Sequence, residues 1–86
     1  MQVLKLFAVY DTKTKTYNRP FTMLTPGQAE RIFTDEVNKS DSEIGNHPED
    51  YTLFELGEFN DETGLITPLQ TPQSLVKAIQ VKKDLN

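Results

Sequence analysis

The run Val3–Tyr10, VLKLFAVY, is apolar at almost every position, and this most restricts the folds open to the chain. Successive side chains of a strand point to opposite faces, so the run divides into two alternating sets. These sets are Val3, Lys5, Phe7, Val9 and Leu4, Leu6, Ala8, Tyr10. Because both sets are largely apolar, the sequence predicts a strand that is covered on both faces or lies in the middle of a sheet.

The next segments predict a turn, a second strand and a helix. The polar run DTKTKT at residues 11–16 indicates the turn, and YNRPFTML at 17–24 a return strand. Pro20 cannot donate to a ladder, so we expect this strand at an edge. Thr25 and Pro26 then open a helix, in which Gln28 completes a capping box. This helix should end near residues 38–40 and bury the stripe Ala29, Ile32, Phe33 and Val37.

The second half of the chain repeats the pattern. An exposed loop is expected at residues 41–48, followed by a strand at 51–59 that supplies Phe54 and Leu56 to the core. NDETG at residues 60–64 indicates a hairpin loop, and 65–69 a short returning strand interrupted by Pro68. Thr71 and Pro72 predict a second helix start. Its apolar side would be Leu75, Val76 and Ile79, with residues 80–86 as a frayed tail.

The order ββαββα predicts a small α+β domain of two layers. We expect a mainly antiparallel sheet of about four strands with two helices, formed by residues 1–86 as a single domain. A chain of 86 residues buries a thin core. Because two strands are also apolar on both faces, we predict that a second copy covers the remaining apolar surface in a homodimer.

Composition excludes several kinds of site. The chain has no cysteine, so it forms no disulfide or thiolate site, and the reducing cytosol is the natural compartment. We expect no signal peptide, and no apolar run approaches the ~20 residues needed to span a bilayer. The one histidine, His47, lies in HPED without a nucleophile or a spaced set of ligands. We therefore expect no enzyme, no catalytic residue, no cofactor and no metal.

Charge is unevenly distributed along the chain. Residues 1–19 carry a net +3, residues 30–62 a net −9 and residues 63–86 a net +2. If the basic ends meet, they form a surface for phosphate, with Tyr17 as the ring for base stacking. The candidate nucleic-acid contacts are Lys13, Lys15, Tyr17, Arg19, Lys77, Lys82 and Lys83. Two alternatives remain open: the charges are ordinary surface scatter, or Tyr10 and Phe21 pack in the core and leave only lysines exposed.

Three segments together resemble a known family. They are FAVYDTKTKTYNRPF at residues 7–21, HPEDYTLFELGEFNDETG at 47–64 and TPQSLVKAI at 71–79. In this order they resemble the small nonstructural protein of gokushovirus-type microviruses, which are bacteriophages with single-stranded circular DNA genomes. The resemblance extends from Leu6 to Ile79 and includes no catalytic signature.

The resemblance implies a nonstructural, DNA-binding protein that supports single-stranded genome synthesis or packaging. It would act in the cytoplasm of the infected bacterium and be absent from the virion. The alternative is an acidic adaptor that uses residues 30–62 to recruit or inhibit a phage or host replication protein without touching DNA. Neither role requires a membrane.

Overall fold

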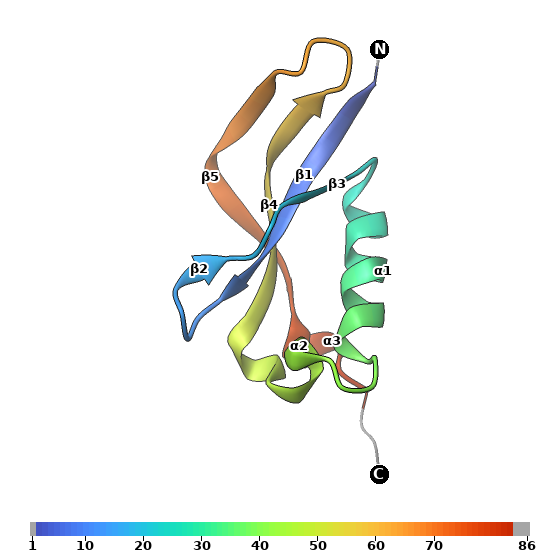
Figure 1. Cartoon of the computed structure of the whole chain (residues 1–86), viewed down its shortest axis with the longest axis vertical. Helices are drawn as coiled ribbons and strands as arrows, with labels where there is room; N and C mark the ends of the chain where they lie inside the picture. Colours follow the sequence, from blue (N-terminus) through green and yellow to red (C-terminus); the bar gives the residue numbers. More distant parts are fainter. Residues whose placement is uncertain (1, 84–86) are drawn as a thin grey trace.

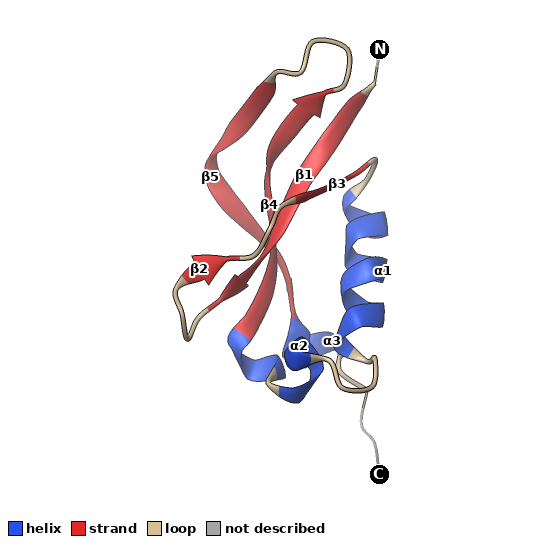
Figure 2. Cartoon of the chain, viewed as in Figure 1, coloured by secondary structure: helices blue, strands red, loops and turns tan. Residues whose placement is uncertain are grey.

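The computed structural model describes residues 2–83, which form one antiparallel sheet and a layer of helices. The strands are β1 (Val3–Asp11), β2 (Thr16–Tyr17), β3 (Phe21–Met23), β4 (Tyr51–Asn60) and β5 (Ile66–Lys77). The helices are α1 (Pro26–Val37), α2 (Glu43–Asn46), the 3-10 helix η1 (Pro48–Asp50) and α3 (Ala78–Val81). The α+β class and the mainly antiparallel sheet are confirmed, with five strands where about four were expected (Figure 2).

The sheet is built around β1. Its order is β2-β1-β4-β5, and β3 pairs with β1 on the same side as β2. The central position expected for Val3–Tyr10 is therefore confirmed. β1 pairs with β4 over its whole length, from Val3 opposite Asn60 to Asp11 opposite Tyr51. One extra β4 residue, Leu56, bulges where Leu6 pairs with Gly57 and Phe7 with Glu55.

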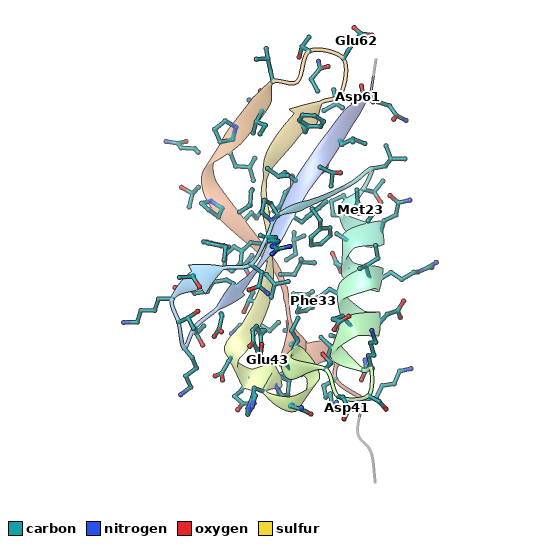
Figure 3. All side chains as sticks on the ribbon, viewed as in Figure 1. Met23, Phe33, Asp41, Glu43, Asp61 and Glu62 are labelled. Atoms are coloured by element: carbon teal, nitrogen blue, oxygen red, sulfur yellow. The ribbon has the colours of Figure 1, made fainter. Side chains whose placement is uncertain are left out.

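The core lies between one face of this sheet and α1. Phe7 and Leu53 are fully buried from the sheet side, and Phe33 and Val37 meet them from α1. Phe33 is seen between the helix and the strands in Figure 3. Figure 1 shows α1 alongside the sheet, with α2 and α3 gathered near its C-terminal end. We call this covered side of the sheet the helix face and the opposite side the open face.

The sheet extends well beyond the helix layer. The principal extents of the molecule are 47 × 23 × 18 Å. The β4–β5 hairpin and the start of β1 continue past α1 in Figure 1. Gly64, with a φ of 78°, closes the hairpin loop, as the sequence predicted.

The start of α1 also confirms its prediction. The Thr25 hydroxyl accepts a hydrogen bond from the Gln28 amide N–H at 3.2 Å, and Gln28 Oε1 accepts the Thr25 N–H at 3.3 Å. The helix ends at Val37 with Asn38 as its C-cap. The expected stripe is wrong at one position, because Ile32 is 44% exposed. Ala29, Phe33 and Val37 follow one another at intervals of four residues and form the buried face of α1 against the sheet. Ile32 lies beside this face.

The expected strand at residues 17–24 is instead two short strands, β2 and β3. The Asn18 N–H still donates to the Val9 carbonyl at 2.8 Å, but Pro20 has no N–H and the strand is interrupted at residues 18–20. The expected loop at 41–48 is also wrong in part, since Glu43–Asn46 is helical. Ser42 caps that turn by accepting the Gly45 N–H at 3.1 Å and is itself buried.

The largest correction concerns the C-terminal third. The expected helix after Thr71-Pro72 is wrong: β5 continues to Lys77, and only Ala78–Val81 is helical. Pro68 and Pro72 are tolerated because β5 is an edge strand. Its pairing with β4 is also interrupted between Pro68 and Gln73, which pair with Gly57 and Glu55. Leu75 and Val76 still pack against the core, but from the strand, while Ile79 is 54% exposed.

The expected orientation of β4 is wrong as well. Tyr51 and Leu53 are buried on the helix face, whereas Phe54 and Leu56 are only half-buried. Alternation fixed which residues share a face but not which face the helices cover. Glu55 is also on the helix face, and its carboxylate lies 3.6 Å from Lys5 Nζ.

Candidate nucleic-acid interface

The register of the sheet identifies the side chains of the open face. Tyr17 pairs with Tyr10, Tyr10 with Thr52, and Thr52 with Lys77, so these four residues form one row across four strands. Paired residues of neighbouring strands point to the same face. The next row places Ala8 beside Phe54 and Ser74. None of the buried core residues that pack with the helices belongs to these two rows.

Three aromatic rings meet on these rows. The ring centroids of Tyr10 and Tyr17 are 4.8 Å apart, and Phe54 lies 5.9 Å from Tyr10 and 5.6 Å from Tyr17. The two contacts of Phe54 are edge-on, a favoured arrangement for aromatic pairs. Tyr17 is 41% exposed, while Tyr10 and Phe54 are half-buried. We call these three residues the aromatic patch.

Basic residues lie at both sides of the aromatic patch. Lys77 ends the row that begins at Tyr17, and it is exposed. Lys15 belongs to the β1–β2 turn, where its N–H donates to the Asp11 carbonyl at 2.8 Å and its φ is 60°. Arg19 is exposed in the segment that follows Tyr17. Register thus places Lys77, from the C-terminal part of the chain, in the row of Tyr17. Lys15 and Arg19 lie within two residues of Tyr17 in the sequence.

Lys13 has a different environment. It lines a pocket of about 330 Å³ with Asp11, Glu43, His47, Asp50 and Tyr51. Three carboxylates around this pocket offset the charge of its ammonium group, so Lys13 attracts phosphate less than Lys15 does. Figure 3 shows Glu43 at this end of the molecule.

Lys82 and Lys83 are held at the C-terminal end of α1. Lys82 Nζ donates to the Val37 carbonyl at 3.4 Å, and the Lys83 backbone N–H donates to Asn38 Oδ1 at 2.7 Å. Asn38 Nδ2 in turn donates to the Val81 carbonyl at 3.0 Å. The structure therefore separates these two lysines from Lys77. Of the tail expected to fray at 80–86, residues 84–86 lie outside the described residues.

A second polar cluster surrounds the pocket beside Lys13. Burial raises the pKa of the Tyr51 hydroxyl above its ordinary value of 10.0. The carboxylates of Asp11 and Glu43 raise this pKa further, through their charge and through hydrogen bonds to the phenol. Close by, the ligand atoms of His47, Glu49 and Asp50 lie within 4.8 Å of one another, a spacing from which a cation can be held.

Sequence reasoning missed two members of the aromatic patch. Phe54 was assigned to the core, and Tyr10 was left open between core and surface. The signal that identifies them is the pairing of Tyr10 with Thr52, which puts Phe54 one row away on the same face. Phe21, the other ring considered for the surface, packs against the core at 5.8 Å from Phe7.

Among the described residues, no helix combines the length and the apolar character needed to cross a bilayer. No curated protein matches the chain, and no solved structure matches it. One family model does match, described as "Phage ORF5 protein", and it covers residues 4–81. The match includes every strand from Leu4 onward and every helix, so the chain belongs to the phage ORF5 protein family.

Proposed function

We propose that this phage protein binds single-stranded DNA on the aromatic patch and performs no chemistry itself. The observation that carries the proposal is the exposed ring of Tyr17, which contacts the rings of Tyr10 and Phe54. Tyr17 and Tyr10 belong to the row that ends at Lys77. Proteins that bind single strands combine such rings, on which bases stack, with cations that follow the phosphates. The three rings contact one another in the free chain, and Ala8, the β1 partner of Phe54, is fully buried beside them, so the rings are ordered before DNA arrives.

The resemblance to the small nonstructural protein of gokushovirus-type microviruses gives this binding a setting. Under that reading, the protein acts in the cytoplasm of the infected bacterium during single-stranded genome synthesis or packaging. The patch offers few basic contacts to phosphate and the chain carries a net charge of −4, so a single copy should bind DNA weakly. Stacking and phosphate contact do not read base edges, which implies little sequence preference.

The test is a salt titration of binding to a labelled single-stranded oligonucleotide. Tyr17→Ala removes the exposed ring and should weaken binding by about 1–3 kcal/mol. Lys77→Glu and Lys15→Glu should each lower affinity and flatten the dependence on salt by about one unit or more. Circular dichroism of each variant shows that the fold is retained.

The matched control is Lys83→Glu, which makes the same charge change at a lysine that is tied to the C-terminal end of α1 and lies outside the row of Tyr17 and Lys77. It should reduce affinity much less than Lys77→Glu. Equal losses from both variants would mean that charge alone, not this face, determines binding.

The adaptor reading is the second outcome of the same experiment. The acidic residues that would serve it are concentrated around α2 and η1, where Glu43, Glu49 and Asp50 lie close together. If wild-type protein shows no salt-dependent binding to the oligonucleotide, the DNA proposal is wrong. Replacement of Glu49 and Asp50 with Ala should leave DNA binding unchanged, and a loss of phage yield from that variant would favour the adaptor.

A further inference from the structure

The part of the open face that extends beyond the helix layer is apolar and uncovered within residues 2–83. Register places Leu4, Phe59 and Ile66 in one row and Leu6, Gly57 and Pro68 in the next. We call these six residues the distal patch. We propose that a second copy of this chain packs its own distal patch against it, sheet face to sheet face. This inference does not depend on the proposed function.

The character of the distal patch supports a dry interface. None of its six residues is charged. Ile66 is 59% exposed and Pro68 is exposed, Leu4, Leu6 and Phe59 are half-buried, and Gly57 is buried beneath the β5 backbone. The helix face of the same strands is different, since Lys5 there lies 3.6 Å from Glu55 and 3.8 Å from Glu58. Interface centres are depleted in charged residues, so only the open face has the composition of such a centre.

The size of the exposed surface also agrees with one missing partner. The chain exposes 5943 Å². A compact monomer of 9.8 kDa should expose roughly 5,200 Å². The excess, on the order of 700–800 Å², is spread over the whole elongated chain, so it shows that surface remains available for a partner and does not measure the contact. The radius of gyration of 13.5 Å, against roughly 12 Å for a compact chain of this length, gives the same picture.

Charge argues against nucleic acid and anionic lipid as the occupant. The β4–β5 loop, which connects the strands that carry Phe59 and Ile66, contains Asp61 and Glu62 (Figure 3). These carboxylates repel nucleic acid and anionic lipid, and the patch has no basic residue to hold a phosphate. In a twofold dimer the same surface of both copies forms the contact. Because the distal patch is uncharged, no charged residues would face each other at the centre of that contact.

The edge of the sheet offers a poorer contact than its face. β5 is an edge strand, but Pro68 and Pro72 lack N–H donors and its ladder is interrupted between Pro68 and Gln73. Prolines and irregular pairing are features that block the addition of another strand. Face-to-face packing remains available. It also leaves the aromatic patch free, because Tyr10 lies about 20 Å along β1 from Leu4.

The experiment is sedimentation of the full chain at about 100 μM, a concentration that populates a dimer with a dissociation constant in the micromolar range or below. Wild-type protein should sediment with twice the mass of one chain, and Ile66→Asp should sediment as a monomer. Ile66 is exposed in the single chain, so this substitution is compatible with folding, which circular dichroism verifies. The matched control is Ile79→Asp on α3, at a site that is 54% exposed, and it should remain dimeric.

A second measurement uses the absence of cysteine in the chain. The single thiol of an Ile66→Cys variant should be alkylated several-fold more slowly at high protein concentration than at low, whereas that of Ile79→Cys should react equally at both. Wild-type protein that sediments only as a monomer would overturn the inference. So would an assembly that survives Ile66→Asp, because the contact would then lie elsewhere.

Discussion

At the scale of single residues, Tyr51 connects the core to the acidic end of the molecule. Its ring is buried against the helices, and its hydroxyl meets two carboxylates, Asp11 and Glu43. A phenol has one proton to donate, so it serves these two acceptors alternately. The ring stabilises the fold by its burial, and the hydroxyl adds its hydrogen bonds only while its proton is in place.

Tyr51→Phe should lower the free energy of unfolding by about 1 kcal/mol at neutral pH, because both carboxylates lose a donor. The pKa of Tyr51 is raised in the folded state. Its contribution is therefore fully present below the unfolded pKa of about 10 and is lost as pH rises through the folded pKa. Urea unfolding at pH 8 and about pH 10.5 should show the gap between wild type and variant closing at the higher pH. A gap that stays constant would contradict the assigned environment.

Gly57 is a second residue with a strict requirement. A Cβ added there would meet the Thr67 carbonyl oxygen and, at 2.8 Å, the Pro68 Cα, both of them backbone atoms of β5. Gly57→Ala should destabilise the protein by about 1–3 kcal/mol, since the hairpin must shift to accept the methyl group. Thermal unfolding measures the loss.

Gly27→Ala is the matched control for that substitution. Its added Cβ would have only Thr25 Oγ1 within 4 Å, at 3.9 Å, and the residue lies in the first turn of α1. Because Ala is the better helix former, this variant should be as stable as the wild type or slightly more stable. Equal destabilisation by both variants would show that the close approach at Gly57 is unimportant.

At the scale of elements, features determined by local chemistry were predicted well. Thr25, Pro26 and Gln28 define the start of α1 through contacts within one turn, and β1 was recognised as central from its own two faces. The start of β5 was predicted as a strand at residues 65–69, but its continuation to Lys77 was missed because Thr71-Pro72 has the local chemistry of a helix start. Pairing with β4, which is distant in sequence, decides the outcome there, and Ser74 and Lys77 take their places on the ladder.

The candidate site follows the same division. Tyr17 and its basic neighbours could be named as candidates from the sequence because they are close together in the chain. Phe54 was not, because its place beside Tyr17 depends on the register between β1 and β4. Lys77 is placed by the pairing of β5 with β4, whereas Lys82 and Lys83 follow α3 and bind the C-terminal end of α1, so the cluster expected from the sequence is divided.

The capping box gives a prediction at this scale. Thr25→Ala removes the acceptor of the Gln28 N–H and should cost about 1 kcal/mol, within a range of roughly 0.5–2 kcal/mol. Thr25→Ser keeps the hydroxyl and should restore most of that loss. Chemical denaturation compares the three proteins. If Ser behaves like Ala, the cap contributes through the methyl group and not through its hydrogen bond.

At the scale of the whole molecule, the thin core and the uncovered distal patch make stability depend on concentration. A dimer that unfolds to two chains is stabilised by mass action, so its midpoint of thermal unfolding should rise with protein concentration. Ile66→Asp should give a midpoint that is the same at all concentrations. Scanning calorimetry over a hundredfold range measures both. A wild-type midpoint that does not move would contradict the proposed dimer.

The pairing of β1 with β4 also determines when the sheet of a newly synthesised chain can form. β1 is synthesised first, yet the strand that pairs with it from end to end finishes at Asn60. A ribosome adds about 5–20 residues per second, so β1 waits a few seconds for that partner. During this interval only β2 and β3 can pair with it, on one side. Translation speed between residues 24 and 60 should therefore govern how much of this protein reaches the native state in an infected cell.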